Sequence, residues 1–195
     1  MSQQQLRSHL LNARASLSAA ERDDAARQVG EHLRNLPELQ QSCTLGSYFS
    51  VRAELPTHAI NQHLMDAQHQ LALPILHPIL AGHLLFLQLS ETTQWTHNKY
   101  GIPEPELNAQ HIVPLQQMQV LLVPLVGFDR SGNRMGMGGG FYDRTLSAWH
   151  KGHIKNLLPI GLALDCQLVD ELPKNPWDVP LPMVITPAKT WDFRS

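Results

Sequence analysis

The chain has 195 residues, of which 43% are hydrophobic and 16% charged, and its formal net charge is −2 at pH 7. This length and apolar content suit one globular domain, so we predict a single domain over residues 1–195 and exclude compositional disorder. The nearly balanced charge argues against nucleic acid as a partner. The sequence has no apolar run of about 18 residues, so we expect no membrane-spanning helix.

The two cysteines, Cys43 and Cys166, lie far apart in the sequence. They provide neither a disulfide framework nor a zinc knuckle. The first residues carry no apolar core of a signal peptide and no small-residue cleavage site. We therefore expect a protein of the reducing cytoplasm.

The first part of the chain predicts two helices. Apolar residues recur at helical spacing from Leu6 to Ala15. Ser18 stands three residues before Glu21, which is the spacing of a capping box. This signal predicts a second helix that begins there and continues to about Leu33.

The rest of the chain alternates strand and helix patterns. Strands are predicted over residues 44–51, 71–76, 83–89, 120–126, 158–164 and 182–186, and helices over residues 58–67 and 141–150. The polar, proline-containing stretch 90–112 predicts a long loop. Because 120–126 is the most apolar run, we expect it to be a central strand buried on both faces. The alternation indicates an α/β fold: a single domain with a mostly parallel central sheet flanked by helices.

A glycine-rich segment, GFDRSGNRMGMGGGFYDR at residues 127–144, follows this most apolar strand and leads into the helix at 141–150. Ligands of open α/β sheets bind outside the carboxyl ends of the strands. Glycines let backbone N–H groups approach phosphate oxygens, and a helix N-terminus adds partial positive charge. The segment is thus a candidate phosphate-binding loop.

Charged residues flank these glycines. Arg134 can offer a planar charged fork to phosphate oxygens, and Asp143 can hold a magnesium ion that bridges phosphates. The segment lacks the Lys-Ser/Thr pair of a Walker A motif, and Phe141 occupies the place of the last glycine of a dinucleotide fingerprint. A tight turn that needs positive φ at several positions remains an equal alternative at this point.

Three further residues have a functional and a plain structural interpretation. Arg7 can reach a ligand or lie on a solvated helix face. Glu54 can accept hydrogen bonds from an amino-substituted heterocycle or be an exposed turn carboxylate. Asp178 can bind a metal ion or start a turn, and the neighbouring Trp177 is expected to be a packing residue. His150 and His153 are three residues apart but lack a third ligand, so a zinc site is not expected.

The run LVPLVGFDRSGNRMGMGGGFYDR resembles the signature of the 5-formyltetrahydrofolate cyclo-ligases, also called 5,10-methenyltetrahydrofolate synthetases. Similar segments span the chain: QLRSHLLNAR, YFSVRAELPT, LALPIL, KYGIPEP and WDVPLPMVITP. The resemblance implies a magnesium-dependent reaction of 5-formyltetrahydrofolate with ATP. The γ-phosphoryl group moves to the formyl oxygen, N10 attacks the formyl carbon, and 5,10-methenyltetrahydrofolate, ADP and phosphate are released.

The resemblance also implies roles for individual residues. The catalytic residues would be Arg134 and Tyr142. ATP would bind at Gln3, Arg7, Arg134, Met135, Gly136, Met137, Gly138, Gly139, Gly140, Phe141 and Tyr142. The folate, possibly polyglutamylated, would bind at Phe49, Glu54, Met137, Gly138, Gly139, Gly140 and Phe141. Magnesium would bind at Asp143 and Asp178, and the protein would act as a monomer.

This chain departs from the family pattern at several positions. Gln3 stands where many members carry a lysine, which removes one positive contact to phosphate. Phe141 replaces a common tyrosine, Trp177 a frequent histidine, and Pro182 an acidic residue of some members. A protein that binds folate or nucleotide without turnover, and a phosphotransferase acting on another small molecule, are the alternative functions.

Overall fold

The structure is a computed structural model that describes residues 2–194, so the outer limits of the predicted domain, Met1 and Ser195, lie outside the described residues. The four α-helices of this part are α1 (Gln3–Ala15), α2 (Ala19–Arg34), α3 (His58–Asp66) and α4 (Phe141–His150). The strands of the main sheet are β1 (Thr44–Gly46), β2 (Gln70–Leu76), β3 (Leu84–Gln88), β6 (Val120–Pro124), β9 (Leu158–Leu162), β11 (Met183–Ile185) and β12 (Thr190–Asp192).

Local sequence signals account for the first two helices. Ser18 accepts a hydrogen bond from the Glu21 N–H, and the Glu21 carboxylate accepts one from the Ser18 N–H, which confirms the predicted capping box of α2. Ser2 and Gln5 form a second such box at the start of α1. Both helices therefore begin where side chains take up backbone groups that a helix leaves free.

Within residues 2–194, the main sheet has the order β12-β11-β9-β6-β1-β2-β3. The inner strands from β11 to β2 are parallel, and the two edge strands are antiparallel to their neighbours. The most apolar strand, β6, lies in the middle, and its residues 120–123 are fully buried. The predicted α/β fold with a mostly parallel sheet is confirmed.

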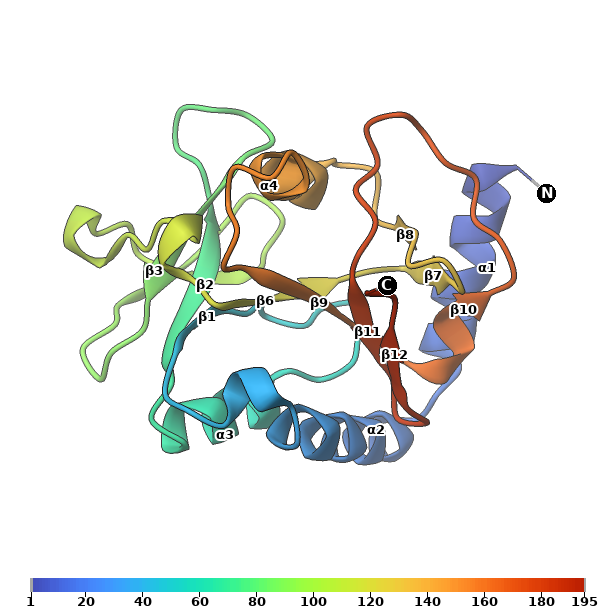
Figure 1. Ribbon diagram of the computed structural model, residues 1–195, viewed down its shortest axis with the longest axis horizontal. Helices are drawn as coiled ribbons and strands as arrows, with labels where there is room; N and C mark the ends of the chain where they lie inside the picture. Colours follow the sequence, from blue (N-terminus) through green and yellow to red (C-terminus); the bar gives the residue numbers. More distant parts are fainter. Residues whose placement is uncertain (1, 195) are drawn as a thin grey trace.

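Helices cover both faces of this sheet (Figure 1). α2 and α3 lie side by side on one face, over an apolar core that includes Val29, Leu45 and Leu122. α4 lies on the opposite face, where Leu121 and Leu146 belong to a second core. Alternate side chains of the central strand thus enter different cores, which is why this strand is apolar at every position.

The connections place an opening at the carboxyl ends of two central strands. α3 connects β1 to β2 on one face, whereas α4 connects β6 to β9 on the other face. The chain therefore proceeds outward in opposite directions from the neighbouring strands β1 and β6. Such a switch point is where open α/β sheets leave a crevice for ligands.

α1 lies at the side of the main sheet, next to a small sheet of β10 (Leu168–Val169), β7 (Gly127–Asp129) and β8 (Arg134–Met135) (Figure 1). β7 and β8 form a hairpin that begins soon after β6. Within the described residues, no helix is long and apolar enough to cross a membrane.

Some predicted elements were wrong. The strand predicted over residues 44–51 ends at Gly46. Beyond it, the Tyr48 carbonyl accepts hydrogen bonds from the side chains of Thr57 and Asn61 and not from the backbone of a neighbouring strand. The short strands β7, β8, β10 and β12 were missed because two or three residues are too few to show a period.

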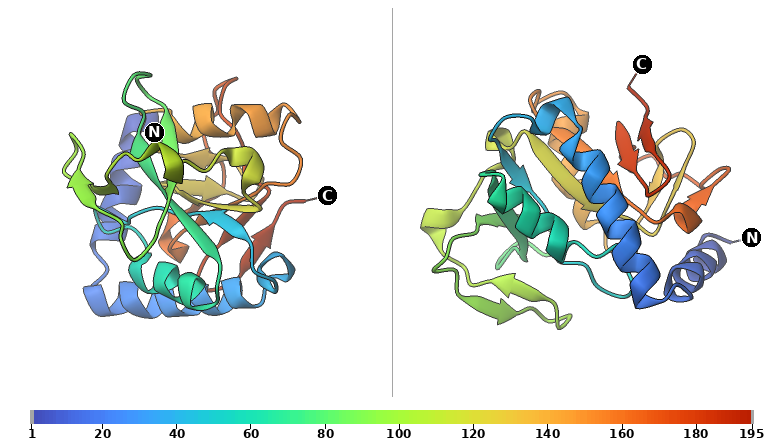
Figure 2. Two further views of the ribbon diagram at one scale, coloured as in Figure 1. Left: turned by 90° about the vertical axis from the view of Figure 1, so that its left-hand side faces the viewer. Right: turned by 90° about the horizontal axis from the view of Figure 1, so that it is seen from below.

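The predicted loop over residues 90–112 was also wrong in part. It contains a hairpin of β4 (Trp95–His97) and β5 (Pro103–Pro105), which projects beside the edge strand β3 (Figure 2). The prolines in β5 argued against a strand because proline has no backbone N–H to donate. A two-stranded hairpin tolerates them, since each strand has one edge that pairs with no other strand. The Glu104 carboxylate accepts a hydrogen bond from the Leu76 N–H and so ties the hairpin to the end of β2.

Candidate active site

A cavity of about 650 Å³ lies at the carboxyl ends of β1, β2 and β6. The structure brings together all residues to which the sequence resemblance assigns a binding or catalytic role. They are Gln3, Arg7, Phe49, Glu54, Arg134, Met135, Gly136, Met137, Gly138, Gly139, Gly140, Phe141, Tyr142, Asp143 and Asp178. Residues from the first helix to the loop before β11 therefore share one concave surface.

The glycine-rich segment forms one wall of this cavity, between β8 and α4. Gly138 has φ of +94° and Gly140 has φ of +67°, a region that side chains with a Cβ rarely adopt. Gly140 is the N-cap of α4 and has no side chain to cap the helix. The positive φ values confirm the tight-turn interpretation. The same turn also presents the helix N-terminus to the cavity, so the two interpretations are compatible.

Arg7 connects the first helix to this segment. Its Nε donates a hydrogen bond to the carbonyl oxygen of Gly136 at 2.9 Å. A Cβ on Gly136 would meet no atom within 4 Å, so the backbone is open toward the cavity at this point. Arg7 consequently brings a positive charge beside exposed glycine backbone, as a site for an anion requires. Gln3, one turn earlier, adds no charge.

Arg134 and Asp143 form a mostly buried ion pair at the base of the segment. The distance between Arg134 Nη2 and Asp143 Oδ1 is 2.7 Å, and their side chains are 4% and 27% exposed. Arg134 also donates a hydrogen bond to the Val179 carbonyl, and Asp143 Oδ1 accepts one from the Val179 N–H at 3.2 Å. Burial lowers the pKa of the Arg134 guanidinium, while Asp143 opposes this shift.

Glu54 occupies the other side of the cavity, in the turn after β1. Its side chain is 12% exposed, and Oε2 accepts a hydrogen bond from the Val51 N–H at 2.8 Å. Burial raises the pKa of the Glu54 carboxyl, whereas this hydrogen bond and Arg14 lower it. The exposed-carboxylate alternative is therefore wrong: Glu54 is a largely buried acceptor that lines the cavity.

Tyr142, in the first turn of α4, lies between the two sides. Burial and the neighbouring charge of Glu54 raise the pKa of its hydroxyl far above the ordinary value, and Arg134 opposes the shift. The phenol therefore stays protonated and is a hydrogen-bond donor at all physiological pH values.

Tyr100, from the hairpin of β4 and β5, adds to the wall of the cavity, whereas Trp95 of the same hairpin lies outside its lining; the sequence reasoning assigned neither residue. Tyr100 packs edge-on against Phe141, with ring centroids 6.5 Å apart. Trp95 packs in the same way against Phe49 at 6.2 Å. The Lys-Tyr-Gly segment could have pointed to this wall, because an exposed aromatic at a glycine turn often serves binding.

Asp178 lies in the loop before β11, where Oδ2 accepts hydrogen bonds from the N–H and side chain of Asn175. Asp178 thus closes a turn that Asn175 starts and does not start one itself, and its side chain also lines the cavity. The expected packing role of Trp177 is wrong, since the residue is 69% exposed. In the described part of the chain, no three His, Cys, Asp or Glu side chains gather as a metal site would require of protein ligands alone.

The fold and the cavity define an α/β protein whose ligand site has two halves of different chemical character. One half is glycine backbone with arginine and a helix N-terminus, which suits an anionic group. The other half is apolar and aromatic around a buried carboxylate. It includes Leu73, Pro74, Ile75, Leu84 and Ile102.

Comparisons with known proteins agree with this description. The pattern of the 5-formyltetrahydrofolate cyclo-ligase family matches residues 1–187. A 5-formyltetrahydrofolate cyclo-ligase of Haemophilus influenzae is 44% identical over 178 residues, covering 91% of this chain and 94% of that protein. One of Escherichia coli K12 is 40% identical over 180 residues, covering 92% and 97%. The chain belongs to the 5-formyltetrahydrofolate cyclo-ligase family.

Solved structures give the same result. The NMR structure of Aquifex aeolicus 5,10-methenyltetrahydrofolate synthetase superposes with a TM-score of 0.84 at 26% identity, covering 100% of this chain and 94% of that one. The 5,10-methenyltetrahydrofolate synthetase of Mycoplasma pneumoniae superposes with a TM-score of 0.73 at 24% identity, which supports the fold.

Proposed function

We propose that the protein converts 5-formyltetrahydrofolate and ATP to 5,10-methenyltetrahydrofolate, ADP and phosphate. The observation that carries the proposal is the meeting of two segments in one cavity: the glycine-rich segment after β6 and the Glu54 turn after β1. A reaction between two substrates requires both binding regions to face the same space. Family membership identifies the substrates.

The ATP phosphates bind along residues 134–142 in this proposal. The backbone of Gly136 and Gly138 is open to phosphate oxygens, whereas the side chains of Phe141 and Arg144 lie against Gly139 and Gly140. The N-terminus of α4 adds partial positive charge. Arg7 supplies a full charge from α1. Met135 and Gln3 also line the cavity.

The folate binds on the opposite side. The ionised Glu54 accepts hydrogen bonds from the row of N–H donors on the pterin, and Phe49 packs against the ring. Met137 and Phe141 are at the border of the two sides and contact both substrates. The apolar strand ends of β2 exclude water from the pterin.

The chemistry depends mainly on position and charge. The formyl oxygen is a poor leaving group until it receives the γ-phosphoryl group of ATP. The N10 lone pair then forms a bond to the formyl carbon, N10 gives up its proton to water, and the C–O bond breaks as phosphate departs. Arg134 adds positive charge beside the transferred group, and the protonated Tyr142 donates a hydrogen bond to developing negative charge.

Asp143 and Asp178 fit a magnesium ion as two of its ligands. Each has one carboxylate oxygen that accepts protein hydrogen bonds and a second with no such bond among the described residues, and both line the cavity. Magnesium is a hard cation that takes carboxylate and phosphate oxygens and neutralises phosphate charge. The described residues do not bring a third His, Cys, Asp or Glu side chain to these two. In this proposal, oxygens of the ATP phosphates fill the remaining positions around the ion.

The proposal extends to the setting in which the protein works. The net charge of −2 supports action without nucleic acid. The free thiols of Cys43 and Cys166 agree with a reducing cytoplasm. We propose a monomer because one chain lines every side of the cavity.

The decisive experiment mixes purified protein with 5-formyltetrahydrofolate, ATP and magnesium and records the absorbance of 5,10-methenyltetrahydrofolate. Product is expected only when all components are present. Binding of both substrates without product would indicate a non-catalytic binding protein. ADP release that does not need the folate would indicate a phosphotransferase for another substrate. A magnesium titration with Asp143→Asn tests the metal assignment, since unchanged kinetics at limiting magnesium would contradict it.

A further inference from the structure

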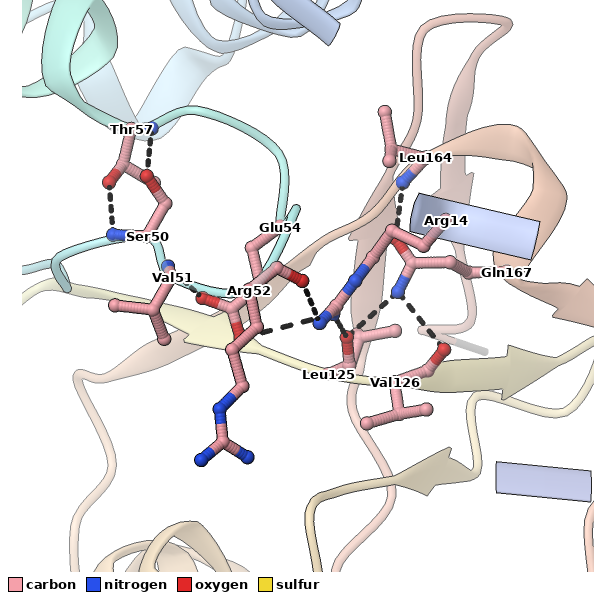
Figure 3. A network of polar contacts seen from close by, with 10 residues as sticks. All are labelled: Arg14, Ser50, Val51, Arg52, Glu54, Thr57, Leu125, Val126, Leu164 and Gln167. Carbon is pink, nitrogen blue, oxygen red and sulfur yellow. Dashed lines mark hydrogen bonds and ion pairs between the residues drawn. The ribbon is translucent and has the colours of Figure 1, made fainter. Parts of the chain in front are cut away.

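Arg14, in the last turn of α1, is a buried cation outside the residues assigned above. Its side chain is 1% exposed. Nη2 donates a hydrogen bond to the carbonyl oxygen of Arg52 at 2.7 Å, and Nη1 lies 3.5 Å from the carbonyl oxygen of Leu125 (Figure 3). Nε is buried without a partner among the described residues. Burying a cation is costly, so this position indicates a function for the charge.

The charge is directed at Glu54. Arg14 Nη1 lies 3.9 Å from Glu54 Oε1, and Figure 3 shows the two side chains pointing toward each other. This is an ion pair and not a hydrogen bond, so Oε1 keeps its lone pairs for another donor. Oε2 accepts from the Val51 N–H at 2.8 Å. Arg14 therefore attracts the carboxylate without using its free oxygen.

The turn that carries Glu54 has an unfavourable backbone. Arg52 has φ of +50° and Ala53 has φ of +59°, although neither is glycine. Such conformations persist only where surrounding contacts hold them. The Arg14 bond to the Arg52 carbonyl is one such contact, and it acts on the first of the two strained residues. Arg14 thus holds both the backbone of the turn and the charge of its carboxylate.

Other contacts fix Arg14 itself. The Leu125 carbonyl, near Arg14 Nη1, also accepts a hydrogen bond from the Gln167 side chain at 2.8 Å. Gln167 is 1% exposed and in turn accepts from the Leu164 N–H. The guanidinium therefore lies in a polar network that joins α1, the end of β6 and the turn after β9 (Figure 3).

The same helix reaches the other half of the cavity. Arg7 and Arg14 are seven residues apart, which is two helical turns, so they lie on one face of α1. Arg7 contacts the glycine-rich segment, whereas Arg14 contacts the Glu54 turn. Leu10 lies between them and is buried against Gly127.

We propose that Arg14 is a positioning residue for the folate side of the reaction. It holds the Glu54 turn in its strained conformation and keeps the carboxylate ionised and aimed into the cavity, where it accepts hydrogen bonds from the N–H donors of the pterin. This inference rests on the proposed role of Glu54. Arg14 itself does not contact either substrate.

Several ionisable groups face Glu54 and set its charge. Arg14 approaches from α1, Arg52 from its own turn, Tyr48 from the end of β1 and Tyr142 from α4. Burial raises the pKa of Glu54, and both arginines oppose this shift. Removing the Arg14 charge, which lowers the pKa of Glu54, raises that pKa further. The carboxylate then loses its charge at a higher pH as the solution is acidified.

The test compares the kinetics of wild type, Arg14→Met, Arg14→Lys, Glu54→Gln and the double variant Arg14→Met/Glu54→Gln. Arg14→Met is expected to raise the folate KM about tenfold or more and to change the ATP KM less than threefold. The acid limb of kcat/KM for the folate should move to higher pH. Arg14→Lys keeps the charge and should restore the acid limb, but the folate KM should stay raised. The same change on an exposed arginine, Arg27→Met, is the control and should leave all values unchanged.

The double variant separates positioning from general damage. If Arg14 acts through Glu54, its loss should matter little once Glu54→Gln is present. An Arg14→Met enzyme with a wild-type folate KM, or with equal losses for both substrates and no shift of the acid limb, would overturn the proposal. If Arg14→Met does not fold, Arg14→Lys decides in the same way by its folate KM. A Glu54→Gln enzyme with an unchanged folate KM would instead overturn the assignment of Glu54, and with it the role of Arg14.

Discussion

The ion pair between Arg134 and Asp143 gives a quantitative test of the site. Arg134 is 4% exposed, so replacing Asp143 by alanine leaves a buried cation without its charged partner. Breaking a buried pair from one side costs about 3–5 kcal/mol, and the 27% exposure of Asp143 favours the lower end. For a domain of this size, about 3 kcal/mol lowers the Tm by roughly 10 °C.

Urea and thermal unfolding of Asp143→Ala measure this loss. The control is Asp192→Ala, which removes an ion pair with Arg194 whose side chains are 44% and 43% exposed. Exposed pairs contribute at most about 1 kcal/mol, so this variant should unfold almost as the wild type does. The double variant Arg134→Met/Asp143→Ala removes the orphaned charge and should recover part of the lost stability.

The reasoning is refuted if Asp143→Ala and Asp192→Ala lose the same small amount. The hydrogen bond to the Val179 carbonyl would then be enough to stabilise the buried charge of Arg134. Loss of turnover without loss of stability would mean that Asp143 serves the nucleotide and not the arginine. Turnover should therefore be measured on the same samples, below the unfolding range.

Other predictions concern the glycines, the carboxylate and a helix cap. Gly140→Ala forces a Cβ into a left-handed conformation and should lower the free energy of unfolding by about 1–2 kcal/mol in urea. Gly136→Ala, where a Cβ meets no atom, should keep its stability and raise the ATP KM in steady-state kinetics. Because burial raises the pKa of Glu54, kcat/KM for the folate should fall on acidification at a pH above the ordinary glutamate value of about 4.3, and Glu54→Gln should lack this acid limb. Ser18→Ala removes the cap of α2 and should cost about 1 kcal/mol in thermal unfolding with unchanged kinetics. An unaltered Tm for both Gly140→Ala and Ser18→Ala would contradict these assignments.

Much of the fold follows from local patterns. The capping box at Ser18 predicted the start of α2, and the unbroken apolar run at 120–126 predicted the central strand. Both signals can be read from the sequence because each depends only on residues that are close together in the chain. The hairpin over residues 95–105 gave no such signal, since its prolines are tolerated only because its edges are free.

The site residues were also named from the sequence, but only through their resemblance to a family. Spacing alone left Arg7, Glu54 and Asp178 open to plain structural interpretations, because each looks like an ordinary surface residue. The structure brings them to one cavity, at the point where connections from β1 and β6 diverge to opposite faces.

The sequence by itself determined the class of fold and the place of the glycine-rich turn, since both depend on residues close together in the chain. Only the tertiary structure decided that Glu54 is buried and that Arg14 stands beside it. The reason is physical: the charge state of a carboxylate depends on burial and on neighbouring charges, and these neighbours come from distant parts of the chain.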